Sequence, residues 1–399
     1  MLTGTNLTYT KAYNYRIVFE AIRLNNKITR AEIARETTLT AQTISNIVTR
    51  LIDGNLIVEG EKIQDGRGAP SVALKINPAS TFSIGIDFNW DHISGVLVDL
   101  AGNIKQQKFI SIEDQSPTDS IEMMASLYND LIKQSTIDKD KLSGVGISFP
   151  GPMKVEDSNI INVVSPKSLP NWLDVPIVTL LAKHISEPIL IENNATAAAM
   201  GEKWFGNAKQ LSNYVYLFFG AGLGAGIFID GQVYNGNKCN AGEIGYFPLS
   251  AGSSPLINVD SHIGANFDLE RLYKWLKQND GTLEISNPDQ LEKLFDDQHP
   301  AFYEWLSASV NILSQSTLYI SYIIDPEAII LGGRIPQKIL THFEKHINEN
   351  LNTLKTEQNI EMPSIECAIA GSNTAALGAA TLPMYHMFSP QYDILMKSK

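Results

Sequence analysis

The chain has few cysteines: Cys239 and Cys367 are too few for a disulfide framework or a cysteine-based zinc cluster. It contains no run of about 18 apolar residues, which excludes a transmembrane helix. Its first residues lack the basic, then apolar, then small-residue layout of a signal peptide. We therefore expect a cytoplasmic protein without membrane contact, and its 399 residues predict two or three domains.

The charge is unevenly distributed along the chain. The net charge is −12, but residues 1–75 carry a net charge of +3 and the remaining residues a net charge of −15. Because an acidic surface repels a polyanion, any contact with nucleic acid should lie in the N-terminal part.

Residues 1–76 predict a winged helix-turn-helix domain. Apolar residues at helical spacing predict a first helix that ends at 25–26. A second helix covers about 30–36, and a third covers 41–52. Thr29 and Glu32 have the spacing of a capping box, and Gly54 is expected to end the third helix in a left-handed conformation. Strand-like runs at 56–63 and 71–76 then form the wing.

The third helix is the predicted DNA-reading element. It has no acidic residue before Asp53, and its short polar and amide side chains suit base edges and phosphates in the major groove. Arg67, between two glycines of the wing, could enter a minor groove, and Arg30 could contact a phosphate. The alternatives are a solvated surface helix and a surface turn. The candidate DNA-contacting residues are Arg30, Thr40, Gln42, Thr43, Ser45, Asn46, Thr49, Arg50 and Arg67.

Residues 77–399 predict a duplicated α/β domain with a cleft between two lobes. Strand-like runs followed by helical and then strand patterns occur within 82–149 and again within 214–331. We expect one lobe to comprise about 77–190 together with the C-terminal end, and the other to comprise 191–375.

Six segments of this part carry a family resemblance. They are Ile84–Asp87, Gly144–Pro152, Ile191–Ala197, Phe219–Gly226, Asn240–Gly245 and Ile330–Gly333. In this order, after a helix-turn-helix, they resemble the ROK family of repressors, open reading frames and sugar kinases. The resemblance implies an actin-like ATPase fold with a sugar site, and it covers nearly the whole chain.

The ATP side departs from the pattern of an active ROK kinase. The family's Asp-x-Gly-x-Thr turn reads Asp87-Phe-Asn89-Trp-Asp91 here, and an acidic group repels a triphosphate. The family's catalytic Asp is Asn194, which cannot accept a proton as a base. Ala221 replaces the Thr of the second phosphate loop, whose glycines then serve only close packing. The resemblance therefore implies no catalytic residue, no cofactor and a lost kinase activity.

The family's zinc site is also missing. Tyr246 stands at the position of the usual His, and no Cys follows within the next twenty residues. We expect no metal and a loop that something else holds.

The sugar side matches the family. The resemblance assigns sugar contacts to Glu243 and Asn193, with Asn194 beside them, and a backbone approach to Pro150 and Gly151. Tyr246 could replace the His as a hydroxyl partner. The alternatives are a carboxylate paired with a lysine for Glu243 and a helix cap for Asn193.

These features predict a sugar-responsive transcriptional regulator, a repressor of carbohydrate uptake or catabolism genes. Its expected partners are a double-stranded DNA operator, a sugar or sugar phosphate, and further copies of the chain in a homodimer or homotetramer. Two alternatives remain: an active sugar kinase with an accessory DNA-binding domain, and a regulator that binds another protein instead of a sugar.

Overall fold

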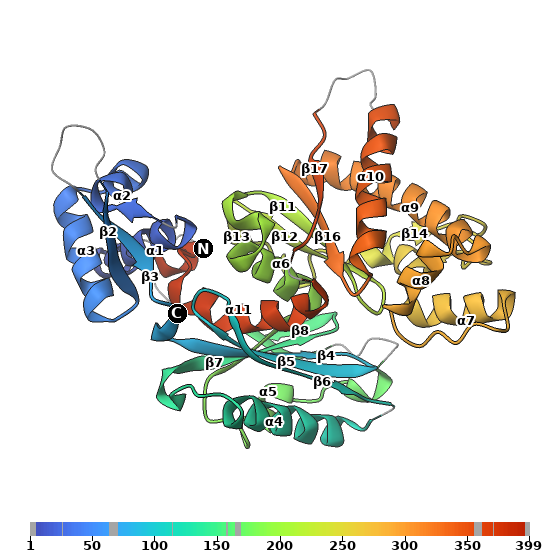
Figure 1. Ribbon diagram of the computed structural model, residues 1–399, viewed down its shortest axis with the longest axis horizontal. Coiled ribbons are helices and arrows are strands. Elements are labelled where there is room, and N and C mark those ends of the chain that lie inside the picture. Colours follow the sequence, from blue (N-terminus) through green and yellow to red (C-terminus); the bar gives the residue numbers. More distant parts are fainter. Residues whose placement is uncertain are drawn as a thin grey trace.

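The computed structural model describes residues 5–25, 27–63, 71–113, 115–156, 159–163, 169–354, 361–369 and 371–395. They form a small N-terminal unit and two larger lobes (Figure 1). Each of the two lobes is built on its own five-stranded sheet. Within these ranges, no helix combines the length and apolar character that crossing a membrane requires.

The N-terminal unit is a winged helix-turn-helix. Its elements are α1 (Leu7–Leu24), β1 (Ile28–Thr29), α2 (Arg30–Thr37), α3 (Ala41–Asp53), β2 (Ile57–Ile63) and β3 (Ser71–Ile76). The three strands form an antiparallel sheet in the order β1-β3-β2. The two-residue strand β1 was not predicted from the sequence, and it pairs with the wing because Thr29 must be extended to cap α2.

Local signals in the sequence explain the ends of these helices. The predicted capping box is confirmed: Glu32 N–H donates to Thr29 Oγ1 at 3.3 Å, and Thr29 N–H donates to Glu32 Oε2 at 2.8 Å. The expectation for Gly54 was wrong. Gly54 has a φ of −76°, and the left-handed residue is Asn55, with a φ of 57°. Asparagine tolerates this conformation because its short side chain can bond locally.

The first lobe has a sheet in the order β10-β7-β4-β5-β6. Helices α4 and α5 cover one face of this sheet, and α11 covers the other (Figure 1). The elements are β4 (Phe82–Phe88), β5 (His92–Asp99), β6 (Ile104–Ser111), α4 (Pro117–Lys133), β7 (Leu142–Phe149), β8 (Met153–Glu156), β9 (Asn159–Val163), α5 (Ile177–Leu181), β10 (Ile189–Asn193) and α11 (Thr374–Phe388). Strand β10 crosses the lobe boundary that we expected after residue 190.

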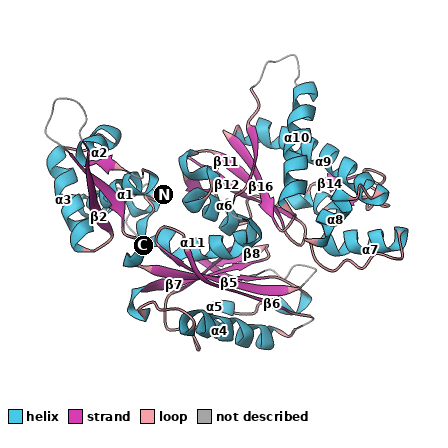
Figure 2. Ribbon diagram, in the orientation of Figure 1, coloured by secondary structure: helices cyan, strands magenta, loops and turns pink. Residues whose placement is uncertain are grey.

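The second lobe repeats this topology. Its sheet has the order β13-β12-β11-β16-β17. Figure 2 shows the strands of both sheets with helices packed against them. In both sheets the first three strands in sequence are antiparallel neighbours, and the last two are added in parallel. The predicted duplication is thereby confirmed. The remaining elements are α6 (Asn194–Phe205), β11 (Tyr214–Phe219), β12 (Leu223–Ile229), β13 (Gln232–Val233), β14 (Pro248–Leu249), β15 (Ser261–His262), α7 (Leu269–Asn279), α8 (Gln290–Asp296), α9 (Pro300–Ile324), β16 (Ala328–Gly333), α10 (Gln337–Leu354) and β17 (Ser364–Cys367).

Two helices connect the lobes, because each follows a strand of one sheet but packs on the other sheet. Helix α6 follows the last strand of the first sheet but packs on β11 and β12 of the second sheet. Helix α11 follows the last strand of the second sheet but packs on β4 and β7 of the first. The two helices touch closely, because a Cβ on Gly378 would lie 2.0 Å from the carbonyl oxygen of Ala197. Any rotation of one lobe against the other must therefore shift α6 against α11.

Candidate functional site

Helix α3 presents its predicted DNA-contacting side chains away from the core. Thr40 caps the helix, since its Oγ1 accepts a hydrogen bond from Thr43 N–H at 3.2 Å. The Gln42 amide donates to Asn46 Oδ1 at 3.0 Å along the exposed face. The side chains of Thr40, Gln42, Asn46, Thr49 and Arg50 are exposed, those of Thr43 and Ser45 are half-buried, and those of Ile44, Ile47, Val48 and Leu51 are buried.

The arginines predicted to contact DNA differ in their surroundings. Arg50 lies over the ring of Tyr15 of α1, 5.1 Å from its centroid. Arg30 pairs with Glu59 of β2 at 2.9 Å. A DNA phosphate would have to compete with each of these contacts. Arg67 lies outside the residues that the structure describes.

Three residues assigned to sugar contact lie together where the lobes meet. Gly151 follows β7 and Asn193 ends β10, both in the first sheet, whereas Glu243 belongs to the second lobe. A Cβ placed on Gly151 would lie 2.4 Å from Asn193 Nδ2 and 2.9 Å from Glu243 Oε1. Pro150 stands before Gly151 in the same loop. A glycine is therefore needed to leave room beside this amide and this carboxylate.

The polar atoms of this cluster are available to a ligand. Asn193 Oδ1 accepts from Ala195 N–H at 2.8 Å and so caps α6, which leaves Nδ2 as a donor toward Gly151. The Glu243 carboxylate makes no hydrogen bond within the described part of the chain, and burial raises its pKa. A donor amide next to a half-buried carboxylate suits a sugar hydroxyl, which both donates and accepts.

Asn194 and Tyr246 complete the predicted set. Asn194 opens α6 and is half-buried. Tyr246 is 57% exposed, and its ring centroid lies 5.6 Å from that of His262. Burial raises the pKa of Tyr246, and the nearby charge of Glu243 raises it further. Tyr246 therefore lies close to Glu243, at the edge of the cluster.

Sequence reasoning gave no role to Glu192, which the structure buries directly beneath this cluster. Its Oε1 accepts a hydrogen bond from Asn193 N–H at 2.7 Å, and burial raises its pKa to about 7. The signal was its position as the first residue of the Glu192-Asn193-Asn194 motif. Glu192 thereby supports the backbone of Asn193.

On the predicted phosphate side, an ion pair joins the two lobes. Asp91 lies in the turn between β4 and β5, and Arg334 follows β16 of the other sheet. Arg334 binds Asp91 through two hydrogen bonds of 3.1 and 2.6 Å. Burial opposes ionisation of Asp91, but the hydrogen bond from His92 and the charge of Arg334 outweigh burial and lower its pKa to about 2. Asp91 is thus not the free acidic group that its sequence position suggested.

The motif residue Asp87 is also engaged by protein groups. Ser148 Oγ donates to Asp87 Oδ1 at 2.5 Å, and His92 Nε2 lies 3.3 Å from Asp87 Oδ2. Burial alone would lower the pKa of His92, but its hydrogen bonds to Asp87 and Asp91 outweigh burial and raise it. Both carboxylates of the turn therefore have partners within the protein.

The phosphate side also contains a cavity of about 920 Å³. Its walls include Trp90, Trp172 and Phe109, together with the Asp91–Arg334 pair. In the second phosphate loop, a Cβ on Gly226 would lie 2.5 Å from the Cβ of Ala199. This glycine therefore serves close packing, as we inferred from the sequence, but against helix α6 rather than a neighbouring strand.

A strand pair and several side-chain hydrogen bonds hold the loop in which the family resemblance places zinc. Strand β14 pairs with β15, and Asp260 Oδ1 accepts from Ala251 N–H at 3.0 Å. Ser254 donates to Asn266 Oδ1, whose amide donates to Ser309 Oγ at 2.9 Å. In the described ranges, no three His, Cys, Asp or Glu residues gather to hold a metal ion.

Comparison with known proteins agrees with this architecture. A model described as "ROK family" matches residues 83–384. The xylose repressor of Bacillus spizizenii (strain ATCC 23059 / NRRL B-14472 / W23) is 27% identical over 399 residues, covering 95% of this chain and 97% of the relative. The N-acetyl-D-glucosamine kinase of Yersinia pseudotuberculosis serotype O:1b is 21% identical over 279 residues, covering 67% of this chain and 88% of the relative.

Solved structures share the fold. The crystal structure of a ROK family transcriptional regulator, a homolog of the E. coli MLC protein, superposes with a TM-score of 0.71 at 19% identity, covering 97% of this chain and 99% of that one. A ROK family glucokinase from Streptomyces griseus in complex with glucose and AMPPNP gives a TM-score of 0.62 at 18% identity, covering 75% of this chain and 98% of that one. The regulator therefore matches the N-terminal unit as well as the lobes.

Proposed function

Because the chain belongs to the ROK family, we propose that it is a sugar-responsive DNA-binding transcriptional repressor of carbohydrate uptake or catabolism genes. In this proposal, α3 reads an operator, the cleft at Gly151, Asn193 and Glu243 binds a sugar, and kinase activity is lost. The names of the full-length relatives make D-xylose the first sugar to test.

One observation carries the proposal: a single helix, α6, runs from the cluster of Gly151, Asn193 and Glu243 to the N-terminal unit. The N-terminal end of α6 carries Asn193 and Asn194, and its C-terminal end carries Trp204 against α1. Its 12 residues span roughly 18 Å at about 1.5 Å per residue. A displacement of the helix at the cleft is transmitted to its other end, since a short helix moves as a rigid body.

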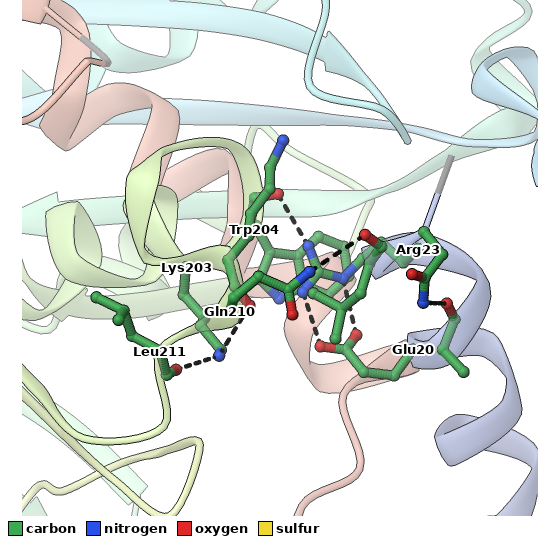
Figure 3. Close-up of polar contacts among 10 residues, drawn as sticks. Glu20, Arg23, Lys203, Trp204, Gln210 and Leu211 are labelled. Carbon is green, nitrogen blue, oxygen red and sulfur yellow. Dashed lines mark hydrogen bonds and ion pairs between the residues drawn. The ribbon is translucent and has the colours of Figure 1, made fainter. Parts of the chain in front are cut away.

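The contact between α6 and α1 is specific (Figure 3). Arg23 of α1 donates to the carbonyl oxygen of Trp204 at 2.9 Å and lies over the Trp204 ring, 4.7 Å from its centroid. Glu20 orients Arg23 through two hydrogen bonds of 2.8 and 2.7 Å. Gln210, just beyond α6, donates to the carbonyl oxygen of Leu24 at 3.5 Å.

Helix α1 also contacts α11, the other helix that connects the lobes. The rings of Phe19 and Phe388 stack at 4.7 Å, and Arg16 donates to the carbonyl oxygen of Ser389, just after α11, at 3.0 Å. Because α6 packs on the second sheet and α11 on the first, α1 rests on both lobes. A sugar that changes the angle between the lobes therefore changes the surface on which the DNA-binding unit sits.

This change reaches DNA through the spacing of two reading helices. In a homodimer or homotetramer, two α3 helices must match half-sites about 34–36 Å apart or a multiple of that distance. A sugar that favours another spacing weakens operator binding, and the operator weakens sugar binding by the same factor.

Two features support a lost kinase activity. Asn194 stands where a catalytic base is required, and its amide cannot take up a proton. The Asp91–Arg334 pair occupies the turn where phosphates would approach. Steady sugar-dependent ADP production by the purified protein would overturn this part and favour a kinase with an accessory DNA-binding domain.

The experiment is fluorescence anisotropy of the full-length protein on its own upstream DNA at fixed salt, with and without D-xylose and a panel of free and phosphorylated sugars. We expect release by one sugar, and loss of that response in Asn193→Ala. The matched control is Asn129→Ala, which removes an amide from the surface of α4, far from the cleft in sequence and structure. A protein that ignores its upstream DNA at low salt would refute the proposal.

A further inference from the structure

A second cavity lies at the junction between the N-terminal unit and the two lobes. It has a volume of about 240 Å³, and its charged lining residues are Arg23 of α1, Lys75 of β3 and Lys209 beyond α6. Among the residues that the structure describes, no acidic side chain lines it. Three cationic side chains that line one cavity stand out in a chain whose net charge is −12.

Arg23 forms a fixed wall of this cavity. Its contacts with Glu20 and with the Trp204 carbonyl hold the guanidinium in place (Figure 3). The Arg23 side chain is 5% exposed. Glu20 balances its charge. The positive charge open to a ligand therefore comes mainly from the two lysines.

Neither lysine ammonium group has an ion pair or hydrogen bond within the described part of the chain. Burial lowers the pKa of Lys209, and the neighbouring Arg23 lowers it further. Glu202 acts in the opposite direction, but backbone N–H groups already engage its carboxylate. An anion between Lys75 and Lys209 would relieve this repulsion.

We propose that this junction cavity binds phosphate, either as inorganic phosphate or as the phosphate group of a small ester, with Lys75 and Lys209 as its charged ligands. Hydrogen bonds between ammonium groups and phosphate oxygens are strong because both partners are charged. The amide of Asn25 lines the same cavity and adds a neutral donor. The volume lies below the usual range for drug-sized ligands, about 300–1,000 Å³, and suits a phosphate with a short organic group.

The position of the site gives phosphate a regulatory effect. Lys75 belongs to the wing of the DNA-binding unit, whereas Lys209 belongs to the second lobe. A phosphate held by both lysines restrains the N-terminal unit on the lobes. Operator affinity should therefore depend on phosphate as well as on the sugar, through a separate site.

The test is isothermal titration of the full-length protein with inorganic phosphate at constant ionic strength. We expect Lys75→Gln/Lys209→Gln to weaken binding about tenfold or more, since two charge-assisted contacts are lost. The matched control, Lys11→Gln/Lys183→Gln, removes the same charge from exposed positions and should bind like the wild type. Absence of phosphate binding by the wild type, or equal affinity in the pocket variant, would overturn the proposal.

Two further arms separate the possible sources and functions. Glycerol phosphate binding as tightly as inorganic phosphate would identify an ester site, whereas binding of inorganic phosphate alone would identify a free-phosphate site. Asn193→Ala should keep phosphate affinity, so failure of the sugar proposal leaves this measurement intact. Operator affinity that does not change at saturating phosphate would refute the proposed restraint.

Discussion

The ion pair between Asp91 and Arg334 should stabilise the contact between the lobes, and Arg334→Met removes it while keeping an apolar stem. The two side chains are 23% and 13% exposed, so the solvent screens the pair only partly. Lowering the pKa of Asp91 from its ordinary 3.8 to about 2 corresponds to roughly 2 kcal/mol of stability at neutral pH. His92 contributes to this shift, and the variant leaves Asp91 without its charged partner. We therefore expect the free energy of unfolding to fall by about 1–3 kcal/mol.

The pH dependence of this loss follows from the direction of the shift. The pKa of Asp91 is lower in the folded than in the unfolded chain, so the stabilisation is fully present above about pH 4 and disappears as the pH falls toward about 2. The difference between the wild type and Arg334→Met should shrink over the same range.

The assay is urea unfolding at neutral pH, followed by tryptophan fluorescence, to which Trp90 and Trp172 of the adjoining cavity contribute. A double-mutant cycle with Asp91→Asn isolates the pair, and we expect a coupling free energy of about 1–3 kcal/mol. Strictly additive single variants would refute the reasoning that the two side chains hold the lobes together.

Four other predictions follow from named contacts. Gly151→Ala should abolish the sugar response but keep operator binding, because its Cβ would meet Asn193 Nδ2 at 2.4 Å; anisotropy with and without sugar checks this. Arg23→Met should keep sugar affinity, measured by calorimetry, but reduce the effect of sugar on operator affinity; an undiminished effect would exclude this contact as the route. Asn46→Ala should weaken operator binding by about 1–3 kcal/mol and relax the base preference at one position, as competition with substituted operators would reveal. Glu192→Gln should raise the melting temperature more at about pH 8 than at about pH 5. The pKa of Glu192 rises to about 7 on folding, so its protonated form stabilises the folded protein below the unfolded pKa, and this contribution is lost as the pH passes 7. Equal shifts of the melting temperature at both pH values would contradict a buried carboxyl.

The fold could be predicted from the sequence because its signals are local or repeated. The capping box at Thr29 and Glu32 fixes the start of α2 within three residues of chain. The same order of strands and helices occurs twice along the chain, so the pattern in one lobe strengthens the prediction of the other. Gly54 was misjudged because the left-handed conformation at the end of a helix can fall on either of two neighbouring residues, and here Asn55 adopts it.

The candidate site could be predicted only in part. Motif positions identified Asn193 and Glu243, but their proximity to Gly151 depends on how the two lobes meet. Arg334, 243 residues after Asp91, carried no local signal for their ion pair. The contact of Arg23 with Trp204 carried no local signal either, because the two residues lie 181 positions apart in the sequence.

Reciprocal linkage is the most direct test of a sugar-responsive repressor. The measurement is the dissociation constant of the releasing sugar, with the protein free and with the protein saturated by operator DNA at the same salt concentration. We predict that operator weakens sugar binding by the same factor by which the sugar weakens operator binding. Sugar affinity unchanged by operator, or unequal factors, would contradict the account.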